Sequence, residues 1–139
     1  MDEIMIAAIP LMLVPLALYN LGMVGLFGGG GVGGLDQVLI SVTMLSGAVW
    51  TLSVGDGLIL VGLVFLFIEI LKSTRNSQAS LMNHMLSLLV FVAFLVEFLA
   101  VRDAATQVFF ILMVIAFIDV IAGFAISVRT ASRDVSIGL

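Results

Sequence analysis

The chain has 139 residues, enough for one domain, and 63% of them are hydrophobic while only 10% are charged. A soluble domain of this size could not bury so much apolar surface, so the composition excludes an ordinary water-soluble fold and favours lipid as the solvent. The net charge of −4, with no basic stretch and no cysteine, excludes a nucleic-acid surface, disulfides and thiolate metal sites. We predict a single integral membrane domain over residues 1–139, an all-α four-transmembrane-helix bundle with a short extracytoplasmic β-hairpin between the first two helices.

The first apolar segment covers about residues 4–27, and a helix needs about 20 such residues to cross a bilayer. Pro10 and Pro15 fall inside it and should bend the helix or remove backbone hydrogen bonds. The chain begins with the acidic Met1-Asp2-Glu3 rather than with a basic stretch. We therefore interpret this segment as a retained first helix and not as a cleaved signal peptide.

The next segment predicts a β-hairpin over about residues 38–54. A glycine run, 28–34, precedes it as a flexible link and lacks the Lys-Ser/Thr of a phosphate-binding loop. Two runs rich in β-branched residues, 38–44 and 49–54, flank the turn signal Ser46-Gly47. A re-entrant or interfacial helix is the alternative. Because an open strand pair cannot lie bare in lipid, we place the hairpin outside the membrane, with Trp50 at the boundary.

Three further apolar helices are predicted over about residues 57–72, 81–101 and 105–128. Asp56, Ser80 and Asp103 each stand just before or at the start of one of these runs, where a side-chain oxygen can cap free backbone N–H groups.

Positively charged residues predict the orientation. Lys72 and Arg75 lie between helices two and three, Arg129 and Arg133 follow helix four, and only Arg102 falls on the other side. The positive-inside rule therefore places both the N- and the C-terminus in the cytoplasm, with the hairpin outside.

Polar residues within the spans fall into two layers when their depth is counted at ~1.5 Å per residue from the outer helix ends. The first, called the Glu69 layer, lies in the inner half of the membrane at roughly 20–27 Å and comprises Glu69, His84, Ser87 and Asp119. The second, the Glu97 layer, lies at about 8–9 Å and comprises Asn20 and Glu97. Ionisable groups at such depths usually face protein or water.

Helical spacing indicates which way the side chain of Asp119 points. Asp119 belongs to a stripe of small or polar residues on the fourth predicted helix, of the kind that favours close helix packing in membranes. The stripe contains Ala116, Asp119, Gly123 and Ser127. We therefore expect Asp119 to point into the bundle or toward a neighbouring subunit.

Two hypotheses account for the buried polar groups. Asp119, Glu69 and His84 could form a proton or cation path, because buried acidic groups can exchange protons. Alternatively, the same groups form hydrogen bonds that fix the order of the helices. A metal site is not expected, since His84 has no second His or Cys as co-ligand. No cofactor motif and no nucleophile beside His84 are evident, so we do not expect an enzyme.

The chain resembles a group of small uncharacterised bacterial inner-membrane proteins in Gly55-Asp56, in the stretch 67–75 and in the stretch 118–124. The resemblance implies a bacterial cytoplasmic membrane and no particular activity. We expect a structural or accessory subunit whose partners are the lipid bilayer, further copies of itself or other membrane protein subunits, and not nucleic acid. An oligomeric small channel or proton/cation transporter that uses Asp119 and Glu69 is the alternative.

Overall fold

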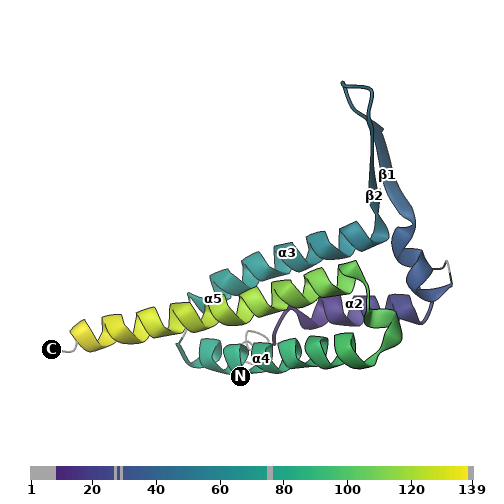
Figure 1. Ribbon diagram of the computed structural model, residues 1–139. Coiled ribbons are helices and arrows are strands. Elements are labelled where there is room, and N and C mark those ends of the chain that lie inside the picture. The colour runs from purple at the N-terminus through teal and green to yellow at the C-terminus, as the bar shows by residue number, and fades with distance from the viewer. Residues whose placement is uncertain (1–8, 27, 29, 75–76, 138–139) are drawn as a thin grey trace.

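The computed structural model describes residues 9–26, 28, 30–74 and 77–137, with side chains for all of these except 77–80, 127 and 130–137. The described part is mostly helical, and an antiparallel hairpin stands out from the helical body (Figure 1). In chain order the elements are α2 (Leu13–Met23), η1 (Gly31–Asp36), β1 (Val38–Thr43), β2 (Val49–Ser53), α3 (Val54–Ser73), α4 (Ser77–Ala100), η2 (Arg102–Ala104) and α5 (Gln107–Ile137).

Three of the described helices have the length and composition of a membrane span: Val54–Ser73, Leu81–Ala100 and Gln107–Ile126. At ~1.5 Å per residue each is about as long as a bilayer core is thick. Large apolar side chains such as Phe67, Leu89 and Ile121 dominate their exposed faces. These features indicate a membrane protein and agree with three of the four predicted spans, although the described residues do not confirm a four-helix count.

The expected first helix over residues 4–27 needs correction, and its first residues lie outside the described part. Residues 9–12 form a bend and turn, and the helix proper, α2, covers only Leu13–Met23. Pro10 cannot donate a backbone hydrogen bond, so the helix begins after it. Pro15 is tolerated because it falls in the first turn, where backbone N–H groups have no partner within the helix.

The predicted hairpin is present, and the helical alternative for this segment is wrong. Strands β1 and β2 pair antiparallel with Ile40 opposite Leu52 and Val42 opposite Trp50. The turn contains Gly47 at φ +89°, a conformation that glycine adopts without strain. A register shift between Val38 and Ile40 introduces a bulge at the base of the hairpin.

The helix caps differ from those predicted. α3 begins at Val54, where Ser53 accepts a hydrogen bond from the N–H of Asp56 and Asp56 accepts one from the N–H of Ser53. Asp56 therefore completes a capping box rather than serving as the cap itself. Before α5, Thr106 accepts from the N–H of Phe109, so Thr106 and not Asp103 is the cap. Ser80 lies inside α4.

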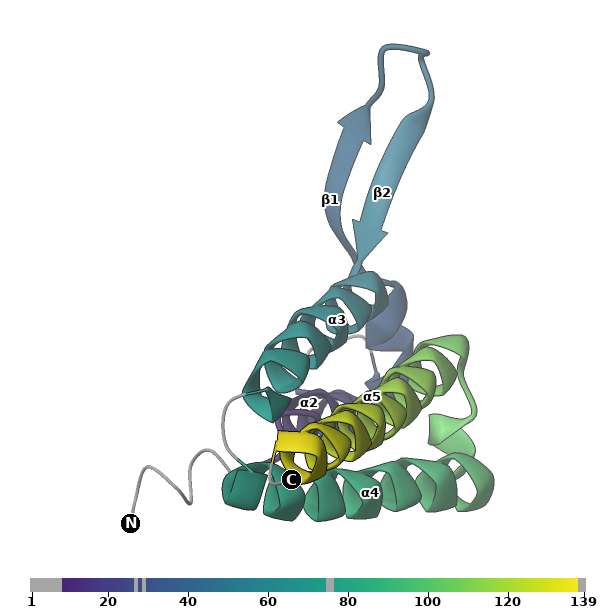
Figure 2. The same ribbon diagram turned by 90° about the vertical axis from the view of Figure 1, so that its left-hand side faces the viewer.

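Glycines allow the helices to approach closely. A Cβ at Gly62 of α3 would lie 3.0 Å from Leu112 of α5, and one at Gly55 would lie 2.7 Å from Val108 of the same helix. Gly123 of α5 is covered by the His84 ring of α4. α5 is thus packed between α3 and α4, the arrangement visible in Figure 2.

Candidate functional site

A polar cluster surrounds the non-helical backbone at residues 9–12, here called the Pro10 break. Glu69 of α3 has no solvent exposure, and its Oε1 accepts a hydrogen bond from the backbone N–H of Leu11. Met12, at the N-cap position of α2, provides no side-chain cap. Because a backbone N–H without a partner is costly in hydrocarbon, Glu69 of α3 compensates for the irregular backbone just ahead of α2.

Lys72, one turn further along α3, binds a backbone carbonyl group of the same break. Its Nζ donates to the carbonyl oxygen of Ile9 at 3.0 Å and lies 3.4 Å from Glu69 Oε1. Asn83 of α4 completes the cluster, since its Nδ2 donates to Glu69 Oε2 at 2.6 Å. The Glu69 carboxylate therefore joins α3, α4 and the start of α2, and both of its oxygens are paired.

Asp119 lies in the same layer but is less well satisfied. It is 4% exposed, as an inward-facing position on α5 predicts. It lies beside Ser87 and within electrostatic range of Glu69 and Lys72. However, Asp119 Oδ2 and Ser87 Oγ are buried without any partner that meets hydrogen-bond geometry among the described residues. This pair is the part of the Glu69 layer whose bonding capacity is not used up.

The Glu97 layer is also brought together. Asn20 Nδ2 of α2 donates to Glu97 Oε2 of α4 at 3.2 Å and to the carbonyl oxygen of Leu16 at 2.9 Å. Glu97 Oε1 is buried and has no partner among the described residues. The equal depth estimated for the two residues from the sequence thus corresponds to a direct contact between two helices.

Tyr19 is a buried polar residue that sequence reasoning missed. Its hydroxyl donates to the carbonyl oxygen of Asp103 at 2.8 Å and lies 2.7 Å from Thr106 Oγ1. Its ring packs edge-on against Phe109 with centroids 4.8 Å apart. The one signal available was a lone tyrosine in an apolar span, because a buried tyrosine hydroxyl usually finds a partner.

An apolar barrier separates the two polar layers. On α4, the buried Val90 and Phe94 lie between Ser87 and Glu97 in the sequence. On α5, buried apolar residues fill the roughly 20 Å between Thr106 and Asp119. The barrier consists of Met12, Val90, Phe94, Phe109, Leu112 and Ala116. Within one chain, therefore, no file of polar groups among the described residues connects the two layers.

The other residues predicted for the site, His84, Gly123 and Ala116, pack against neighbours in the same chain. His84 covers Gly123, and its ring stacks near Phe124 with centroids 6.1 Å apart. Ala116 is buried in the core, while the side chain of Ser127 lies outside the described part. The small-residue stripe thus faces α4 of the same chain, at least from Ala116 to Gly123.

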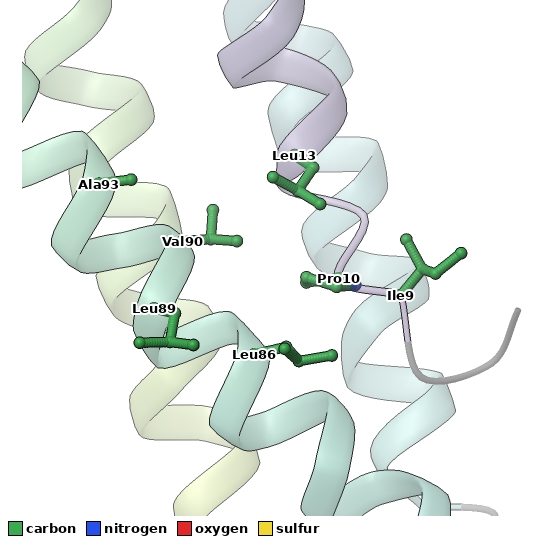
Figure 3. Close-up of a pocket in the computed structure, with 7 residues that line it drawn as sticks. All are labelled: Ile9, Pro10, Leu13, Leu86, Leu89, Val90 and Ala93. Atoms are coloured by element: carbon green, nitrogen blue, oxygen red, sulfur yellow. The ribbon is translucent and has the colours of Figure 1, made fainter. Parts of the chain in front are cut away.

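A pocket of about 380 Å³ lies where the Pro10 break leaves α4 uncovered (Figure 3). All of its lining residues are apolar, so it offers no group that could orient a polar substrate or hold a metal. They are Ile9, Pro10, Leu13, Leu86, Leu89, Val90 and Ala93.

The described residues contain no group of three or more His, Cys, Asp or Glu side chains that could hold a metal ion. Comparison of the chain with protein families, with curated proteins and with solved structures gives no match. The resemblance to small bacterial inner-membrane proteins therefore stays a prediction, and function has to be argued from the polar clusters themselves.

Proposed function

We propose that this protein is a structural or accessory subunit of a membrane assembly, without catalytic activity of its own. The observation that carries the proposal is the bonding of Glu69, whose two carboxylate oxygens both accept hydrogen bonds from other segments of the same chain. A carboxylate engaged in this way stabilises a particular helix arrangement. It is poorly placed to bind and release a transported ion.

The apolar barrier supports the same proposal. The rings of Phe94 and Phe109 are fully buried with centroids 5.3 Å apart, between the two polar layers. A conduction path through one copy would have to displace them. The surfaces left for partners are the apolar outer faces of α3, α4 and α5 and the open edges of the hairpin, which a partner strand could extend.

In this proposal the protein resides in a bacterial cytoplasmic membrane with both termini in the cytoplasm. Lys72 and Arg129 support this orientation, since Lys72 lies in the last turn of the span Val54–Ser73 and Arg129 follows the span Gln107–Ile126, both at the end opposite the hairpin. The Glu69 layer then lies in the inner half of the bilayer and the Glu97 layer near its outer surface.

The test is extraction in native nanodiscs, followed by measurement of the particle mass and identification of every co-purifying chain. We expect defined additional subunits. Single alanine substitutions at Phe67, Leu88 and Ile121, one on each exposed helix face, then locate the contact, because only the variant at the interface should lose the partner while its thermal stability is kept. A monomeric particle with no partner would refute the proposal.

A second candidate, an oligomeric proton or cation channel, is favoured by one observation: Asp119 Oδ2 is buried and has no hydrogen-bond partner in the described part of the chain. Several copies could then build a path that a single copy lacks. Ion flux into proteoliposomes separates the two functions. If Asp119 only packs against its neighbours, Asp119→Asn should leave assembly and ion flux unchanged. If Asp119 lines a conduction path, the parent and the exposed control Asp36→Asn should both show ion flux, and Asp119→Asn should lose it.

A further inference from the structure

The hairpin is an exposed element without charged side chains. Residues 37–55 contain no charged side chain. Every residue from 38 to 51 is exposed, and Leu45 at the tip is completely so. A two-stranded hairpin is marginally stable in water, and charged residues usually protect such open edges. The hairpin therefore needs a surface that covers its apolar side chains.

The strand register divides these side chains between two faces. Directly paired residues point to the same face, and successive pairs alternate. One face, called the hairpin apolar face, is formed by the pairs Ile40–Leu52 and Val42–Trp50. The opposite face carries the next pairs, Ser41–Thr51 and Thr43–Val49, and is rich in hydroxyl groups. The hairpin is thus amphipathic without bearing charge.

The connection to α3 fixes the direction in which the hairpin runs. β2 ends at Ser53 and α3 begins at Val54, with no linker between them. The Ser53–Asp56 capping box and a hydrogen bond of 2.9 Å from the N–H of Val54 to the carbonyl oxygen of Gln37 hold the junction. Figure 1 shows the hairpin rising crosswise to the long axes of the helices, and Figure 2 shows it clear of the helical body. A hairpin that leaves a spanning helix crosswise at its end runs along the membrane surface.

Three surroundings are possible, and only one suits every group. Bulk water would leave the apolar face exposed, and the hydrocarbon core would leave the backbone groups of both strand edges without hydrogen-bond partners. The bilayer interface accepts apolar and aromatic side chains on one side and supplies water and headgroups to the edges on the other. We propose that the hairpin docks on the lipid surface beside α3, with Ile40, Val42, Trp50 and Leu52 inserted into the interface.

This inference is independent of the proposed subunit role, because it concerns lipid and can be tested on the purified chain alone. Trp50 is the only tryptophan in the sequence, so intrinsic fluorescence reports this one position on the hairpin apolar face. The protein is reconstituted into phosphatidylcholine vesicles, with or without lipids brominated near the headgroup, and also titrated with aqueous acrylamide. We expect blue-shifted emission, loss of most of the signal in brominated vesicles and protection from acrylamide.

A matched control moves the tryptophan to the opposite face. The double variant Trp50→Phe with Thr51→Trp keeps an aromatic residue at position 50 and leaves the strand pairing intact. Circular dichroism and thermal unfolding establish that it folds. Its tryptophan should be quenched more by acrylamide and less by brominated lipid than Trp50 in the parent protein.

Two results would overturn the inference, and both come from the parent protein without any variant. Strong quenching of Trp50 by acrylamide, with none by brominated lipid, would place the hairpin in water. Protection from both quenchers would mean that protein covers the face, either a co-purified partner or a second copy. Identification of every chain in the purified sample separates these two, because only self-association leaves this chain alone in it.

Discussion

Glu69 on α3 accepts a hydrogen bond from the backbone N–H of Leu11, a residue 58 positions earlier that lies just ahead of α2. The carboxylate thereby pairs a backbone N–H that lies ahead of the first turn of α2. With Lys72 bound to the carbonyl oxygen of Ile9, two side chains of one helix satisfy both kinds of backbone group at the Pro10 break. Glu69 and Lys72, whose charged groups are costly to bury in a membrane, thus compensate for the irregular backbone of the Pro10 break.

Replacement of Glu69 should destabilise the bundle strongly. Glu69→Leu leaves the N–H of Leu11 and the amide of Asn83 without acceptors, at a cost of about 1–3 kcal/mol for each unpaired donor. Glu69→Gln retains an acceptor for Leu11 and should lose less. Thermal unfolding in detergent measures both, with the exposed Asp36→Asn as control. Equal stability of the Leu variant and the parent would show that the hydrogen bonds of Glu69 do not stabilise the bundle.

The Tyr19 hydroxyl should stabilise the opposite end of the bundle. Tyr19→Phe keeps the ring contact with Phe109 but removes the bond to the carbonyl oxygen of Asp103, a loss of about 0.5–1.5 kcal/mol. Thr106→Val should cost somewhat more, because it also removes the cap of α5. A double-mutant cycle on the two residues should show a coupling energy, since the hydroxyls contact each other. Simple additivity would contradict that contact in solution.

Gly123 should tolerate no side chain while His84 is present. A Cβ at position 123 would lie 2.7 Å from His84 Nδ1, so Gly123→Ala must displace the ring or separate α4 from α5, at about 1–3 kcal/mol. Adding His84→Ala should recover part of the loss, because the space is vacated. Unfolding of the single and double variants tests this. A double variant less stable than the sum of the two single changes would argue against the packing.

The sequence predicted the spanning helices and the hairpin because both depend on local pattern. The apolar runs lie close to the spans Val54–Ser73, Leu81–Ala100 and Gln107–Ile126, although α5 itself continues to Ile137. The turn at Ser46-Gly47 between β-branched runs specifies the hairpin. The sequence predicted Asn20 and Glu97 at the same depth, and the structure adds that they contact each other directly.

What the sequence could not provide depends on tertiary partners. An apolar run containing Pro10 is compatible with a kinked helix or with a broken one, and the choice rests on whether another element can satisfy the freed backbone. That element, Glu69, is distant in sequence. Its bond to the N–H of Leu11 therefore became visible only with the fold, as did the partners of the Tyr19 hydroxyl and the contact of His84 with Gly123.

The proposed orientation can be tested directly, because the chain contains no cysteine and any introduced thiol is unique. Asp103 is exposed in the turn between α4 and α5, at the same end of the bundle as the hairpin, while Arg129 is exposed beyond the third candidate span. In bacterial spheroplasts, a membrane-impermeant maleimide should label Asp103→Cys from outside and should reach Arg129→Cys only after the membrane is permeabilised. The reverse labelling pattern would invert the topology, move the Glu69 layer to the outer half of the bilayer and bring the hairpin to the cytoplasmic surface. Lipid docking of the hairpin would survive that result, since it depends on the crosswise junction with α3 and not on which side of the membrane the junction lies.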